Sequence, residues 1–262
     1  MMSKDNTVIE PFISVNSKGM VSHSPMRVEA VVSRNVRVPA YLTEVYSWAY
    51  LNPVATKFFN HQAVVTAILW GNYGRLFRAV LEELRPGQRV LQLASVYGPF
   101  SARLAEALGP TGRLDVVEVA PIQVARCQRQ LERLDNVRVI LGDAASPPEG
   151  YYDVVLSFFL LHEVPEDYKV AIVEAALARL APGGRAVFID YHRPVWWHPL
   201  RPIMALVFDW LEPFARALLA REIKDYAPSG GPRFSWFKQI FFGGLYQKSV
   251  ASSPAASKGA AV

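Results

Sequence analysis

Between residues 85 and 192, short apolar runs alternate with segments in which apolar residues recur at every third or fourth position. The runs are nearly continuous, which is typical of strands buried on both faces of a parallel sheet. The recurrent spacing is typical of helices with one buried face. This alternation predicts an α/β fold with a doubly wound sheet. The expected strands are residues 90–94, 114–118, 137–141, 152–158 and 185–189.

The pattern changes on both sides of this region. Residues 39–85 are rich in aromatic residues at helical spacing, and they predict a helical preface that either caps a cleft or packs on the sheet. Residues 234–241 and 245–250 flank a Phe-Gly-Gly turn and predict a β-hairpin that closes the sheet. We therefore expect a single domain over residues 39–250. The segments 1–38 and 251–262 are rich in small and polar residues and are expected to be mostly disordered.

Residues 195–223 carry more apolar surface than one helix needs to cover a sheet. Trp196, Trp197 and Trp210 stand among arginines, and Pro213 divides the segment. Such a composition is typical of an element that lies at a membrane interface, or of a lid over an apolar substrate. The alternative is an ordinary pair of packed helices. No apolar run reaches the ~18 residues of a membrane-spanning helix. We expect a cytoplasmic protein that can lie peripherally on the inner membrane.

The composition narrows the classes of partner. Of the 262 residues, 51% are hydrophobic, which suits the core of one α/β domain with additions. The 28 basic and 23 acidic side chains give a net charge of +5 and are scattered along the chain. This charge favours anionic lipid head groups or acidic ligands, whereas no motif indicates binding to nucleic acid. The single cysteine, Cys127, is expected to be a packing thiol on a helix in a reducing compartment.

A strand, a tight turn and a helix follow one another around Gly98. Such a turn aims backbone N–H groups and the positive end of the helix at a ligand above the carboxyl end of the strand. Glu118 ends the next strand, where a carboxylate can accept both hydroxyls of a ribose. Asp143 follows the third strand and reaches the same edge of the sheet. Together these residues predict a nucleotide-type binding site.

Further ionisable side chains follow the fourth and fifth strands. His162 and Glu163 come after the fourth strand, and Asp190 and His192 come after the fifth. Because consecutive βα units place these strands side by side, we expect both pairs to face one cleft. Carboxylate and imidazole ligands suit Mg²⁺ or Mn²⁺, so Glu163, Asp190 and His192 are the expected metal ligands. The alternative is that each of them only caps a helix or forms local hydrogen bonds.

The order of first loop, Glu118 and Asp143 resembles that of the class I S-adenosylmethionine (SAM) methyltransferases, which have a Rossmann-like fold, over roughly residues 60–250. This resemblance implies that Glu118 holds the ribose hydroxyls of SAM and that Asp143 and Ala144 border its adenine. The first loop departs from the family pattern, because only the last of three glycines is kept and a β-branched residue stands where the backbone normally closes on the ligand. Its four pattern positions are Gln92, Ala94, Val96 and Gly98, of which Gln92, Ala94 and Gly98 are expected to contact SAM.

Four stretches resemble the rhodoquinone-biosynthesis enzymes known as RquA, which are relatives of the ubiquinone and menaquinone C-methyltransferases. That resemblance implies that SAM is an amino donor, that a ring methoxy group of ubiquinone is replaced by an amino group to give rhodoquinone, and that Mn²⁺ is required. The altered first loop fits a donor handled differently from a methyl donor, and the apolar segment 195–223 fits a quinone drawn from a membrane. The four stretches are YSWAYL at 46–51, LWGNY at 69–73, LASVYG at 93–98 and DYH at 190–192.

Two other functions stay open. A SAM-dependent C- or O-methyltransferase acting on a quinol or another lipid would use His162 or His192 as its base. Tyr97, in the first loop, is the third candidate catalytic residue. A non-catalytic protein of the same fold would bind a quinone or a partner enzyme, and the loss of the loop glycines at Ala94 and Val96 favours that alternative.

Overall fold

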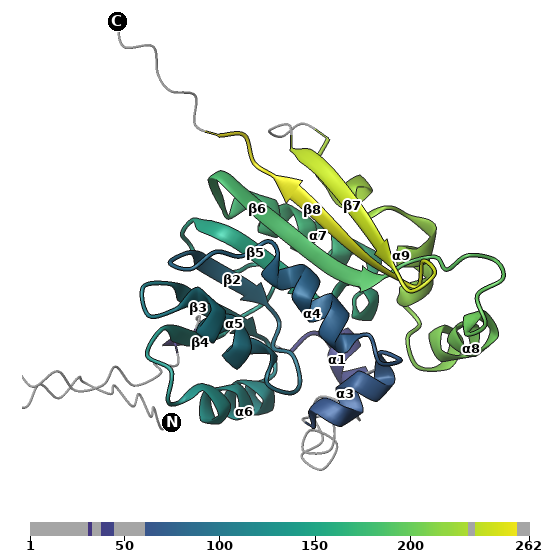
Figure 1. Cartoon of the computed structure of the whole chain (residues 1–262), viewed down its shortest axis with the longest axis horizontal. Coiled ribbons are helices and arrows are strands. Elements are labelled where there is room, and N and C mark those ends of the chain that lie inside the picture. The colour runs from purple at the N-terminus through teal and green to yellow at the C-terminus, as the bar shows by residue number, and fades with distance from the viewer. Residues whose placement is uncertain (1–30, 33–37, 45–60, 230–233, 256–262) are drawn as a thin grey trace, which may run out of the picture.

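The computed structural model describes residues 31–32, 38–44, 61–229 and 234–255. They contain one eight-stranded sheet in the order β1-β4-β3-β2-β5-β6-β8-β7 (Figure 1). The strands from β1 to β6 pair in parallel, whereas β8 runs antiparallel to both β6 and β7. The bounds of the strands are β1 Val31–Val32, β2 Arg89–Leu93, β3 Arg113–Glu118, β4 Val137–Leu141, β5 Tyr152–Phe158, β6 Leu180–Tyr191, β7 Ser235–Phe241 and β8 Tyr246–Ser252.

Helices cover both faces of this sheet (Figure 1). One apolar cluster joins alternate strand residues such as Val90 and Val116 to α4, α5, α6 and α8. The other joins the intervening residues, such as Leu91 and Val117, to α7 and α9. The helices are α1 Ala40–Glu44, α3 Gln62–Ile68, α4 Tyr73–Leu81, α5 Phe100–Leu108, α6 Pro121–Leu131, α7 Glu166–Ala178, α8 Arg201–Trp210 and α9 Ala215–Ala220, with short 3₁₀ turns η2 Leu161–Glu163 and η3 Ile223–Tyr226.

The parallel register brings the carboxyl ends of the central strands to one edge of the sheet. Leu93 at the end of β2 is level with Val117 of β3 and Ser157 of β5, and Phe158 of β5 is level with Ile189 of β6. Side chains that directly follow these strands therefore share one edge. This is the geometry expected of a doubly wound sheet, and the predicted fold is confirmed.

Two predicted boundaries need correction. Strand β6 begins at Leu180, before the expected strand 185–189, because Gly184 lets the chain pass so close to β5 that an added Cβ would lie 2.9 Å from the carbonyl oxygen of Tyr152. The segment 251–262 begins with ordered residues, since Ala251 and Ser252 end β8 and Ser253 donates its N–H to the carbonyl of Gly184.

Some expectations for the flanking segments concern residues that the structure does not describe. Most of the segment 1–38 and the stretch 46–51 lie outside the residues that the structure describes. Within the expected helical preface, α1, α3 and α4 are helices. Cys127 is buried in α6 among apolar side chains, where burial raises the pKa of its thiol to about 12. It is a packing residue, as expected.

Candidate functional site

The first loop, residues 94–98, follows β2 and keeps the backbone shape of a glycine loop with only one glycine. Ala94 has φ +71°, and Gly98 has φ +76°. The left-handed region costs a residue with a Cβ about 1–2 kcal/mol. An added Cβ on Gly98 would lie 3.7 Å from Cα of Gln62, so the start of α3 covers this turn. The loop is thus held in a strained conformation beneath α3.

Glu118 anchors the loop from below. Its Oε2 accepts hydrogen bonds from the backbone N–H and the hydroxyl of Ser95 at 3.0 and 2.6 Å, and its Oε1 accepts one from the N–H of Ala120 at 2.9 Å. Gln92 is fully buried, donates to the carbonyl of Ala94 and accepts from the hydroxyl of Ser101. Gln92 therefore supports the loop from inside the fold, and its expected contact with SAM stays a prediction.

Helix α6 fixes the other side of the loop. The Arg126 guanidinium lies 4.6 Å from the ring centroid of Tyr97 and donates to the hydroxyl of Ser95. Gln123 donates to the hydroxyl of Tyr97 at 2.8 Å, and Gln130 donates to the carbonyl of Gly98 at 2.6 Å. The Tyr97 hydroxyl is held by α6, so this side chain is a positioned wall of the site. The Tyr97 hydroxyl accepts the hydrogen bond from Gln123 and keeps its own proton, and the side chain lines the cavity described below, so Tyr97 stays a candidate catalytic residue.

Asp143 and Ala144 follow β4, next to Glu118 at the end of β3. Asp143 Oδ1 accepts from the N–H of Ala145 at 2.8 Å. Tyr41 of α1 packs edge-on against Tyr168, with ring centroids 5.2 Å apart. Burial and then the charges of Asp143 and Glu163 raise the pKa of Tyr41. Tyr41 therefore lies close to both carboxylates, a position that its place in the predicted helical preface did not reveal.

A buried histidine and aspartate form the centre of the second half of the site. His162 Nδ1 donates to Asp190 Oδ1 at 2.8 Å. Asp190 Oδ2 accepts from the backbone N–H groups of Leu161 and His162 at 2.9 and 3.3 Å, and Oδ1 also accepts from Tyr191 N–H at 2.7 Å. The Asp190 side chain is 1% exposed. It therefore caps η2 and sets the orientation of the imidazole.

The other nitrogen of His162 faces two carboxylates. Nε2 lies 3.8 Å from Glu163 Oε1 and 3.9 Å from Glu212 Oε2. Burial lowers the pKa of His162, but the charges of Asp190, Glu212 and Glu163 outweigh it and raise the pKa to about 9. His162, Glu163 and Glu212 offer ligand atoms that all lie within 4.8 Å of one another. Within the ranges that the structure describes, they are the one group of this kind.

The structure does not bring the expected metal ligands Glu163, Asp190 and His192 together in one group. His192 lies beyond the last residue pair of β6, where its Nδ1 donates to the Gly244 carbonyl at 2.9 Å and its Nε2 accepts from Lys238 at 2.8 Å. Burial lowers its pKa. Hydrogen bonds to the hairpin turn thus hold the ring, and Asp190 is occupied by His162 and η2. Glu212 takes their place, and its sequence signal was a lone acid between apolar neighbours in residues 210–214.

A cavity of about 450 Å³ lies against this cluster. Its walls are mostly apolar, and His162, Glu163 and Glu212 gather on one side of it. Ser95, Val96 and Tyr97 of the first loop also line it, so it adjoins the expected cofactor site. The apolar walls come from the end of β5, from residues 65–70 and from α8 with the residue after it, and include Val65, Leu69, Phe158, Phe159, Met204, Val207 and Leu211.

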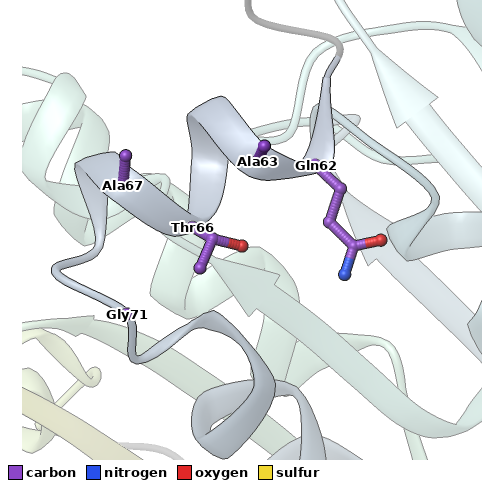
Figure 2. A pocket seen from close by; sticks show the side chains of 5 residues that line it. All are labelled: Gln62, Ala63, Thr66, Ala67 and Gly71. Carbon is purple, nitrogen blue, oxygen red and sulfur yellow. The ribbon is translucent and has the colours of Figure 1, made fainter.

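A second hollow lies on the outer side of α3 (Figure 2). It is lined by two alanines, a glycine, one hydroxyl and one carboxamide, with no ionisable group among the residues drawn. Ala67 contributes to both hollows. The ionisable side chains His162, Glu163 and Glu212 line the other cavity, beside β5 and α8.

Comparisons with known proteins agree with this geometry. Residues 90–184, from β2 into β6, match the family model described as methyltransferase domain. The structure superposes on an O-methyltransferase family protein from Burkholderia thailandensis with a TM-score of 0.61 at 14% identity, covering 86% of this chain and 66% of the other. Human N-acetylserotonin methyltransferase, solved in complex with SAM, gives a TM-score of 0.56 at 16% identity, covering 83% of this chain and 61% of the other. The chain has the class I SAM methyltransferase fold.

Part of the chain is also similar to curated proteins that are named as methyltransferases. The chain is 29% identical over 172 residues to the ubiquinone/menaquinone biosynthesis C-methyltransferase UbiE of Ectopseudomonas mendocina (strain ymp), which covers 61% of this chain and 64% of that protein. It is 28% identical over 161 residues to the demethylmenaquinone methyltransferase of Staphylococcus aureus (strain JH9), covering 61% and 62%. The alignments thus span less than two thirds of these relatives.

Proposed function

We propose that this chain is a SAM-dependent transferase that acts on the ring of an isoprenoid quinone or quinol. The observation that carries the proposal is the apolar cavity of about 450 Å³, which adjoins the first loop and has its charged groups gathered on one side. Such a cavity suits an apolar molecule with one polar end. The relatives named for ubiquinone and menaquinone biosynthesis support this class of acceptor.

The proposed SAM site lies over the ends of β2, β3 and β4. Glu118 holds the ribose hydroxyls, Asp143 and Ala144 border the adenine, and the backbone at Ala94 and Gly98 approaches the methionine part. The Ser95 hydroxyl now bonded to Glu118 can rotate away when a ribose hydroxyl takes its place. The Ser95 N–H stays on the carboxylate and keeps the loop anchored.

The proposed acceptor site is the cavity itself. The quinone ring lies between the first loop and His162, with its tail toward the apolar walls formed by Met204 and Val207. His162 is the candidate catalytic residue, because it lines the cavity and Asp190 fixes its ring. We assign no catalytic role to His192 in this proposal, because its ring is hydrogen-bonded to Gly244 and Lys238 of the β7–β8 hairpin.

The specific reaction that we propose is replacement of a ring methoxy group by an amino group, as the resemblance to RquA implies, with Mn²⁺ as cofactor. One imidazole and two carboxylates are a donor set that fits Mn²⁺, so His162, Glu163 and Glu212 are the residues that would hold it. A bound ion of this kind supplies Lewis-acid polarisation of a carbonyl. Asp190 then acts by orienting the His162 ring, as carboxylates commonly do behind ligating histidines.

The second candidate reaction is C-methylation of the quinol ring, which the two curated relatives favour. One experiment separates the two: the chain is incubated with SAM, Mn²⁺ and ubiquinone or a demethylated quinol, and the product is examined by mass spectrometry. Loss of a methoxy group with gain of an amino group supports amino transfer. Gain of a methyl group in place of a ring hydrogen assigns methyl transfer. Absence of either product, with SAM bound, would overturn the transferase proposal.

A further inference from the structure

Helix α8 is apolar on two sides. Met204 and Phe208 are buried against the sheet layer, with exposed fractions of 2% and 3%. Ile203, Leu206 and Trp210 follow at helical spacing on another side, and the last two have 60% and 79% of their surface exposed. Trp196, just before the helix, is 80% exposed. We call Trp196, Trp197, Ile203, Leu206 and Trp210 the α8 rim.

The same helix forms a wall of the cavity. Met204 and Val207 line the cavity, while Ile203, Leu206 and Trp210 of the α8 rim are exposed on the same helix. Across the cavity, Ile68 and Trp70 also line it and are 47% and 40% exposed. Exposed apolar side chains therefore occur on both segments that form walls of the cavity, α8 and residues 65–70. Figure 1 shows α8 projecting from the sheet at the end where the parallel strands finish.

Two arginines flank the tryptophans at the start of the α8 rim, and the acidic side chains come later in the segment. Between residues 193 and 216 the acidic side chains are Asp209, which pairs with Arg216, and Glu212, which lines the cavity. Arg193 and Arg201 are exposed beside the tryptophans. Basic side chains next to exposed tryptophan fit the head-group layer of an anionic lipid surface, where an indole places its ring among the acyl chains and its N–H in the polar layer.

We propose that the α8 rim lies on an anionic phospholipid surface and that the apolar acceptor passes from the lipid into the cavity along α8. Among the described residues, no helix is long and apolar enough to cross a membrane. A protein partner seated on the rim would cover the way into the cavity, whereas a lipid layer leaves it open to a lipid substrate. The route for the acceptor rests on the proposed function, and the lipid contact does not.

The test is sedimentation of the full chain with vesicles of phosphatidylglycerol and phosphatidylcholine. The double variant Trp196→Ser, Trp210→Ser is compared with Tyr151→Ser, Phe237→Ser, a matched pair of exposed aromatic residues that lie outside the α8 rim. We expect the parent and the matched pair to bind, and the rim variant to lose about tenfold in vesicle affinity. Circular dichroism and thermal unfolding verify that all three proteins are folded.

Two activity assays, one with a short-tailed and one with a long-tailed quinone, test the lipid contact separately from the proposed transferase function. The rim variant should convert a short-tailed, water-soluble quinone as the parent does, but a long-tailed quinone in vesicles more slowly. If no quinone is converted by any protein, the proposed function fails and vesicle binding still decides the lipid contact. Equal vesicle binding by the rim variant and the parent overturns the proposal. So does a dimer that forms in the parent and separates in the rim variant, since the rim would then bind a second copy.

Discussion

Ala94 has a left-handed backbone conformation that glycine adopts more easily. Changing Ala94 to Gly removes a strain of about 1–2 kcal/mol and adds a smaller entropy loss on folding, so we expect the free energy of unfolding to rise by about 0.5–1 kcal/mol. Urea unfolding measures this. The control is Ala102→Gly in the first turn of α5, which should lower the free energy of unfolding by up to about 1 kcal/mol. A loss at both positions would mean that Ala94 carries no strain.

Glu118 is the side chain on which SAM affinity should depend most. Removing a charged acceptor costs about 1.5–3 kcal/mol per hydrogen-bonded group, so Glu118→Ala should weaken SAM binding by one to two orders of magnitude in isothermal titration. Part of that loss comes from the loop, because Ser95 bonds to the same carboxylate. Ser95→Ala keeps Glu118 and should weaken binding much less. Unchanged affinity in Glu118→Ala would place the ribose elsewhere.

At the scale of residues, the sequence located strand ends better than side-chain directions. The position of Glu118 beside the first loop follows from the order of the strands, and that of Asp143 from the next turn. His192 follows a strand too, but the hairpin that captures its ring comes 52 residues later in the chain. Glu212 lies in a connection between two helices. No local pattern predicts such long-range hydrogen bonds.

Among the elements, the short turn η2 depends on a side chain of β6. The Asp190 carboxylate accepts the N–H groups of Leu161 and His162 and pairs with the imidazole, all in a buried place. Asp190→Asn removes the charge and one acceptor, so the free energy of unfolding should fall by about 3 kcal/mol. Asp209→Asn, which breaks an exposed pair with Arg216, should cost less than about 1 kcal/mol. Equal losses in urea unfolding would contradict the role of Asp190 as a cap.

The strands were predictable because each is buried on both faces and reads as an apolar run. The length of β6 was not predictable, because a Pro-Gly-Gly sequence normally ends a helix or strand. Here Gly184 allows an irregular parallel pairing of β6 with β5. Pro213 does separate two helices, α8 and α9, as the sequence indicates. Which side of α8 faces the cavity depends on how Met204 and Phe208 pack in the core cluster, which no periodicity records.

Over the whole molecule, two halves of one sheet edge serve different parts of the proposed reaction. The ends of β2, β3 and β4 hold the carboxylates and loop assigned to SAM, and the ends of β5 and β6 hold the histidine cluster and cavity. The first loop belongs to both halves, because Ser95 bonds to Glu118 and also lines the cavity. A donor and an acceptor bound in these places would meet at the loop. In the proposed reaction, the unusual residues of the loop would thus lie where the two substrates meet.

The histidine cluster also joins the sheet to the apolar segment, since His162 and Glu163 follow β5 whereas Glu212 follows α8. A metal ion held by all three would therefore bind the folded chain and not the unfolded one, and Mn²⁺ at 100 times its dissociation constant would add about 2.7 kcal/mol to the free energy of unfolding. We expect thermal unfolding of the parent to shift upward with Mn²⁺. The shift should be lost in Glu212→Gln and kept in Asp209→Asn, which changes an exposed acid close by in the sequence. An equal shift in the parent and both variants would place the ion elsewhere, and no shift in the parent would remove Mn²⁺ from the proposed reaction.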